Sequence, residues 1–77
     1  MQRDKALADL GNGLRRLRLD RGLTQEALAD LCNLHPTYIA GLETGRRNPS
    51  YLTLCALARG FGLPLSRFIV NIEGADA

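Results

Sequence analysis

Hydrophobic residues recur along the chain at helical spacing, and short polar or glycine-containing stretches divide them into five segments. In the first segment, about residues 4–20, leucines at a 3-4-3 spacing form one apolar stripe: Leu7, Leu10, Leu14 and Leu17. Gly22 is expected to end this helix in the left-handed conformation. Gly11 and Gly13 lie within it, and each is expected to cost about 1 kcal/mol relative to alanine.

The second and third segments are predicted to form a helix-turn-helix over about residues 24–44. Thr24 is a suitable N-cap for a helix that ends near Asn33 and carries apolar residues on one side: Ala27, Leu28, Leu31 and Cys32. The next helix starts after Leu34, has Pro36 in its first turn and ends at Gly45. Because only three or four residues join them, the two helices should cross steeply.

Two further helices complete an all-α prediction. Ser50 should cap a helix from Tyr51 to about Phe61, and Pro64 should open the last one. No alternating pattern is long enough to predict a strand, so we expect one compact five-helix domain over residues 1–77.

Five apolar residues near the end of the chain are more than one small core easily absorbs. A chain of 77 residues buries only about 60–65% of its unfolded surface, so pairing often stabilises such domains. Residues 62–73 are therefore predicted to form a dimerisation segment with these members: Leu63, Leu65, Phe68, Ile69 and Ile72. The alternative is that all five belong to the core.

Composition excludes several functional classes. With 45% hydrophobic and 23% charged residues, the chain is typical of a globular protein. No apolar run approaches the roughly 18 residues of a membrane span, and Gln2 to Asp9 mixes both charge signs, unlike a signal segment. We therefore expect a cytoplasmic protein that does not enter a membrane. Cys32 and Cys55 lie among apolar neighbours, as buried thiols in a reducing compartment do.

Neither a metal site nor a catalytic site is predicted. Two cysteines and one histidine cannot supply a four-ligand zinc site by themselves. His35, the single histidine, has no cysteine partner in the pattern, and there is no carboxylate dyad or glycine-rich phosphate loop. We expect a binding module without a cofactor rather than an enzyme.

Arginine dominates the positive charge. The net charge is only +2, yet nine of the ten cations are arginine, whose planar donors suit phosphates and guanine edges. One cluster comprises Arg15, Arg16, Arg18 and Arg21, and the other comprises Arg46 and Arg47. The alternative is that both clusters belong to a solvated helix face and loop, as charge runs generally do.

The third predicted helix carries small or polar side chains along one arc: Pro36, Thr37, Ala40, Gly41 and Thr44. Ile39 and Leu42 lie on the opposite, inward side. The slim arc is either a plain solvated face or one that enters a DNA groove, where a threonine methyl can contact a thymine methyl.

Groups that suit phosphates flank this helix. Gln25 lies in the first turn of the preceding helix, where free backbone N–H groups attract anions. The residues that we expect to contact phosphates are Gln25, His35, Thr44, Asn48 and Ser50.

Arg18 falls at the edge of the first leucine stripe, where a charge needs a partner. Glu43 lies at the edge of the inward side of the third helix. We predict an Arg18–Glu43 ion pair that fixes the two helices together.

The stretch LTQEALADLCNLHPTYIAGLETGRRNPSYLTLCALARGFGL resembles the helix-turn-helix of the Cro and phage-repressor type, also called the xenobiotic-response-element family. The resemblance covers roughly residues 10–68. It rests on Thr24, Gln25, Leu28, Ala29, Ile39, Glu43, Gly45, Asn48, Pro49 and Ser50. It implies a lambda-repressor-like domain that binds operator DNA as a homodimer. Gln25 would contact a phosphate, and the residues at the groove or its walls would be Pro36, Thr37, Tyr38, Ala40 and Gly41.

LHPTYIAGLETGRRNPS in a chain of this length is also similar to the controller proteins of restriction–modification systems, which regulate their own operon. In that group the positions of Thr37, Tyr38, Ala40 and Arg47 take part in DNA contact. Some members of that group carry arginine or asparagine at position 36 and serine at position 40. This chain departs from them with Pro36 and Ala40, which lack hydrogen-bonding side chains. DNA shape, or Arg46 and Arg47 reaching bases, is expected to compensate.

Two functions therefore remain open. The first is a homodimeric, sequence-specific regulator on a near-palindromic operator, with Asp30 or Glu26 available for a contact with RNA polymerase. The second is an antitoxin or coactivator-like helical module that mainly binds a protein partner, since fold alone does not decide function.

Overall fold

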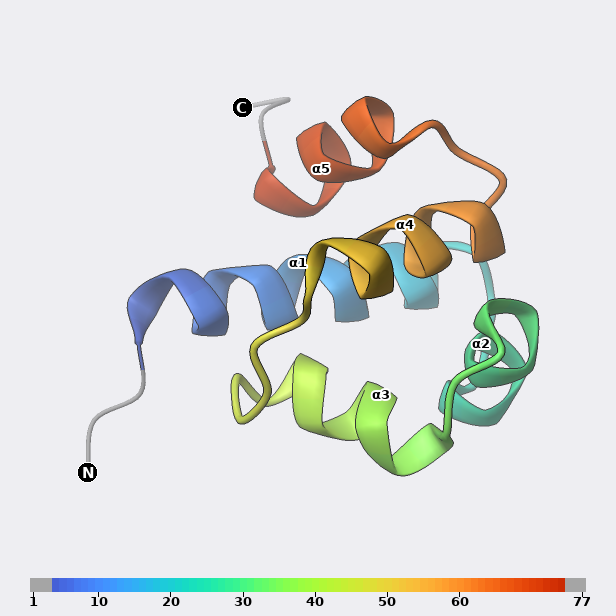
Figure 1. The fold of residues 1–77 in the computed structure, drawn as a ribbon, viewed down its shortest axis with the longest axis horizontal. Coiled ribbons are helices and arrows are strands. Elements are labelled where there is room, and N and C mark those ends of the chain that lie inside the picture. The colour runs from blue at the N-terminus through green and yellow to red at the C-terminus, as the bar shows by residue number, and fades with distance from the viewer. Residues whose placement is uncertain (1–3, 75–77) are drawn as a thin grey trace.

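The computed structural model describes residues 4–74, which form five helices joined by short turns (Figure 1). Their bounds are α1 Lys5–Asp20, α2 Gln25–Cys32, α3 Pro36–Glu43, α4 Tyr51–Gly60 and α5 Leu65–Glu73. These bounds agree with the predicted segments to within about two residues, and residues 4–74 contain no strand. The all-α prediction is confirmed, while residues 1–3 and 75–77 of the predicted domain lie outside the described part.

The helix starts are set by local side chains. Thr24 Oγ1 accepts the Ala27 N–H at 3.0 Å, and Ser50 Oγ accepts the Thr53 N–H at 3.1 Å. Pro36 occupies the first turn of α3, where its missing N–H costs nothing. The predicted starts of α2 and α4 are therefore confirmed by the bonds that their caps make, whereas Pro64, which precedes α5, makes no side-chain cap bond.

The helices pack around one apolar core. Helix α1 contacts both α3 and α5, α2 contacts α3 and α4, and α4 contacts α5. The largest fully buried side chains are Leu14, Leu28, Ile39, Leu42, Leu57 and Phe68. Figure 1 shows α3 and α5 at opposite edges of the domain, with α1 and α4 between them.

Gly11 and Gly13 are contact points between helices rather than mere weaknesses in α1. A Cβ atom at position 11 would lie 2.6 Å from the carbonyl oxygen of Glu43. A Cβ atom at position 13 would lie 2.6 Å from the carbonyl carbon of Ile72. The two glycines therefore let α1 approach the backbones of α3 and α5.

Three predictions about individual apolar residues are wrong. Phe68 and Ile72, predicted at a dimer interface, are 0% and 2% exposed within the single chain and belong to its core. Leu31, predicted on the inward side of α2, is 57% exposed. The buried face of α2 centres on Leu28, Ala29 and Cys32, and Leu31 lies about 100° around the helix from Cys32.

No single helix within residues 4–74 is long and apolar enough to cross a membrane. Helices α4 and α5 meet that test of length and composition only as a pair, across a 90° bend.

Candidate nucleic-acid interface

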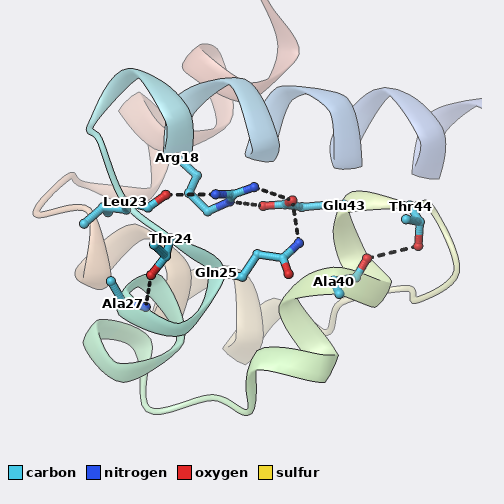
Figure 2. Close-up of polar contacts among 8 residues, drawn as sticks. All are labelled: Arg18, Leu23, Thr24, Gln25, Ala27, Ala40, Glu43 and Thr44. Carbon is cyan, nitrogen blue, oxygen red and sulfur yellow. Dashed lines mark hydrogen bonds and ion pairs between the residues drawn. The ribbon is translucent and has the colours of Figure 1, made fainter.

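A buried ion pair positions α3 (Figure 2). Arg18 Nε donates to Glu43 Oε2 at 2.6 Å, and Arg18 Nη2 donates to Oε1 at 3.0 Å. Both residues are only 7% exposed. Hydrogen bonding to Glu43 raises the pKa of Arg18 above its usual value, so the guanidinium keeps its charge despite burial. The predicted pair is confirmed, and its two-point geometry fixes α3 in rotation as well as in distance.

Two further bonds extend this network. Arg18 Nη1 donates to the carbonyl oxygen of Leu23 at 2.8 Å, and Gln25 Nε2 donates to Glu43 Oε1 at 3.1 Å. The pair therefore connects α1, the turn after it, α2 and α3 (Figure 2). One N–H of the Gln25 amide donates inside this network, so its predicted phosphate contact depends on the other N–H of that amide or on the helix N-terminus.

The slim face of α3 points outward. Thr37 and Thr44 are exposed and Ala40 is half-buried, whereas Ile39 and Leu42 on the other side are buried. Thr44 donates its hydroxyl to the carbonyl oxygen of Ala40 at 3.0 Å. Among the polar side chains of this face, Thr37 is therefore the one best placed to contact a base.

The other predicted contact residues surround this face, but several side chains already have roles in the fold. His35 caps α3, because its Nδ1 accepts the Thr37 N–H at 3.1 Å. Ser50 caps α4 and also donates its hydroxyl to Thr53 Oγ1 at 3.0 Å. Asn48 and Arg46 are exposed on the loop between α3 and α4.

The two arginine clusters have different surroundings. In the first cluster, Arg18 is buried, Arg16 donates to the carbonyl oxygen of Asn71, and Arg21 donates to that of Phe61 at 3.1 Å. These residues tie α1 to neighbouring elements. Arg46 and Arg47 are exposed, as most of the first cluster is, but they lie directly after α3. The second cluster is therefore the better candidate for DNA.

Arg47 also contacts α3, which the sequence alone did not indicate. Its guanidinium carbon lies 5.6 Å from the centre of the Tyr38 ring, within range of a cation–π interaction. Its stem passes close to Gly41. Gly41 and Tyr38, predicted to face the groove or its walls, are thus partly covered by Arg47.

Within residues 4–74, no three His, Cys, Asp or Glu side chains come close enough to hold a metal ion. Cys32 and Cys55 are both free thiols. Burial raises the pKa of Cys32 to about 11, so its thiol is protonated at neutral pH and is a poor nucleophile.

The fold and its outward helix agree with comparisons to known proteins. A helix-turn-helix family model matches residues 14–68. The chain belongs to this family. Control protein C.MunI from Mycoplasma sp is 38% identical to it, over 82% of this chain and 86% of that protein.

Solved structures of controller proteins are similar to it as well. The restriction–modification controller protein C.AhdI from Aeromonas hydrophila is 35% identical, with a TM-score of 0.80 over 84% of this chain and 98% of that one. The C.Esp1396I controller, solved as a tetramer on its natural 35-base-pair operator, is 32% identical, with a TM-score of 0.78 over 86% and 87% of the two chains. The comparisons support a DNA-binding transcription regulator over a module that mainly binds a protein partner.

Proposed function

We propose that this protein is the controller of a restriction–modification system, and that it binds a near-palindromic operator as a homodimer. The observation that carries the proposal is the outward face of α3, which is slim, exposed at Thr37 and held by a buried ion pair. A helix of this kind fits the major groove, where side chains read base edges while flanking groups contact phosphates.

Phosphate contacts would come from both sides of α3. The N-terminus of α2 begins at Gln25, and that of α4 follows Ser50. Their first backbone N–H groups carry partial positive charge. Arg46 and Asn48 are exposed between α3 and α4 and supply side-chain donors. His35 and Thr44, at the two ends of α3, complete the predicted phosphate set.

Four apolar residues that the core does not fully bury, in α5 and the turn before it, support the homodimer. We define the α5 patch as the following residues: Leu63, Leu65, Ile69 and Val70. The first three are half-buried and Val70 is 50% exposed, so a second copy could bury them further. Because α5 and α3 lie at opposite edges (Figure 1), pairing through α5 leaves both α3 helices free. On a two-fold operator these helices would lie about 34 Å apart.

A controller also acts on transcription. Asp30 and Glu26 are exposed on α2 and are candidates for a contact with RNA polymerase, which would place the protein in the cytoplasm with the bacterial DNA. No catalytic activity is part of this proposal.

Selection of bound sequences from random duplexes tests the DNA function. We expect one near-palindrome to emerge, with affinity that falls steeply with salt, by about 0.9 log units per log unit for each phosphate contacted. Thr37→Ala should relax the preference at one base pair by about 1–3 kcal/mol. Asn12→Ala, which removes an exposed polar side chain on α1, should leave it unchanged.

The same experiment can contradict the proposal. If no selected duplex binds better than random DNA, the antitoxin or coactivator-like alternative is the better account. If the gene for this protein lies beside genes for a methyltransferase and an endonuclease, that arrangement would support the controller role specifically.

A further inference from the structure

The side chain of Arg47 lies against the outward surface of α3 instead of extending freely into solvent. At one end its guanidinium group covers the Tyr38 ring, at 5.6 Å from the ring centre. Along its stem, Cγ lies so close to Gly41 that a Cβ atom at position 41 would be 2.7 Å from it. Two neighbouring turns of α3 thus hold one arginine.

The turn after α3 directs Arg47 back towards that helix. The Gly45 N–H donates to the Leu42 carbonyl at 3.2 Å, and the Arg46 N–H donates to the Gly41 carbonyl at 2.9 Å. This is the bonding pattern of a Schellman motif, and Gly45 takes the left-handed φ of 75° that it requires. The backbone therefore reverses within two residues, and Arg47 returns along the face that α3 presents.

Gly41 has no other evident structural purpose at this position. Glycine is a poor residue for the interior of an eight-residue helix, and alanine is the best one. The backbone of Gly41 is helical, with no left-handed φ to require glycine. The three atoms nearest to a Cβ atom there all belong to the Arg47 side chain. The glycine makes room for the arginine alone.

We propose that Gly41 is a positioning residue, and that together with the Tyr38 ring it holds Arg47 in place to read a base pair in the major groove. This inference rests on the proposed DNA function and deepens it. An arginine that is ordered before binding loses less conformational freedom when it forms a bidentate contact, such as that with guanine O6 and N7.

The sequence of α3 explains why an ordered Arg47 side chain would be useful for reading a base pair. Pro36 and Ala40 on the same face carry no hydrogen-bonding side chain. Arg47 supplies donors over the surface that these residues leave bare. In such a guanine contact, Arg47 of the loop would donate the hydrogen bonds, and Tyr38 and Gly41 of α3 would hold its side chain in position.

A double-mutant cycle tests the proposal with four proteins: the wild type, Gly41→Ala, Arg47→Ala and the variant with both changes. Each protein is titrated with two operators. The first is the selected operator. The second carries a G·C to A·T change at one base pair, which is the base pair that the Arg47→Ala variant no longer distinguishes. We expect Gly41→Ala to weaken operator binding about tenfold when Arg47 is present, as for loss of one base contact, and less than about twofold when it is absent. Gly41→Ala should also lose discrimination at that same base pair.

Thermal melting serves as the control for folding. Alanine favours a helix interior, so Gly41→Ala should melt no lower than the wild type. If Gly41→Ala weakens binding equally with and without Arg47, the added methyl group obstructs the DNA directly and the proposal is wrong. If Gly41→Ala leaves affinity and discrimination unchanged while the wild type binds its selected operator, the proposal is also wrong and the proposed function stands. Failure of the wild type to select any operator would instead overturn the proposed function itself.

Discussion

Arg18 and Glu43 meet through two parallel hydrogen bonds, of 2.6 and 3.0 Å, beneath the helix that faces outward. The pair joins residues 25 positions apart and leaves neither charge exposed. Its effect on function is indirect, because it fixes where α3 lies relative to α1 and α2. Two charges in a low-dielectric setting are stabilising only when both are present, since either one alone pays the full cost of leaving water.

Loss of one charge from this pair should therefore be severe. Glu43→Gln leaves Arg18 buried without a counter-charge, and we expect the free energy of unfolding to fall by about 3 kcal/mol. Chemical denaturation of the purified protein measures this change. Asp9→Asn is the matched control, because Asp9 bonds Lys5 at 2.8 Å on an exposed surface, where an ion pair contributes little to stability. Equal effects of the two substitutions would contradict the structural role of the buried pair.

Close approach between helices makes Gly13 sensitive to a single methyl group. Gly13→Ala brings a Cβ atom against the backbone of Ile72 in α5, and backbone cannot move aside as a flexible side chain can. We expect a loss of about 1–3 kcal/mol in the free energy of unfolding, even though alanine is the better helix former. Asn12→Ala, at the exposed neighbouring position, should be neutral or slightly stabilising. A Gly13→Ala variant as stable as Asn12→Ala would show that α1 and α5 are not in close contact.

Local signals were enough to predict where the helices start and stop. Thr24, Ser50 and Pro36 act on backbone groups within a few residues of themselves, so their roles follow from the sequence alone. The Arg18–Glu43 pair was also predictable, because a charge at the edge of an apolar stripe requires a partner. These features depend on short-range geometry or on a simple requirement for charge balance.

Other features depend on how distant segments meet. Gly11 and Gly13 look like weak points in α1 until the backbones of α3 and α5 are placed beside them. Phe68 and Ile72 share the helical pattern of Ile69, and only packing shows that they belong to the core. The contact of Arg47 with Tyr38 depends on the reversal of the chain at Gly45, although a glycine inside the short predicted third helix was a possible signal for it.

Burial of Cys32 makes stability depend on alkaline pH. Its pKa rises from the ordinary 9.0 to about 11 in the fold because burial disfavours the thiolate. Between these values the unfolded chain loses the thiol proton and the folded chain keeps it, so unfolding releases a proton and stability falls as pH rises. We expect this residue to account for a loss of roughly 2 kcal/mol between pH 9 and pH 11.

Denaturation at several pH values, compared between variants, isolates this effect from other groups that titrate. Cys32→Ala should have a shallower decline from pH 9 to pH 11 than the wild type. Asn12→Ala, which removes no titratable group from an exposed position of α1, should decline as the wild type does. Identical declines in all three proteins would show that Cys32 is not responsible.

The α5 patch should control the oligomeric state without contributing much to the fold of a single chain. Val70→Glu places a charge where the proposed homodimer is apolar, so we expect a monomer in sedimentation at micromolar concentration and weaker binding to a two-fold operator. Leu19→Glu is the matched control, because Leu19 on α1 is similarly exposed, at 53% against 50% for Val70, and lies outside the patch. It should leave both properties unchanged. If the wild type is already a monomer at this concentration, or if Val70→Glu still sediments as a dimer, the homodimer does not form through α5.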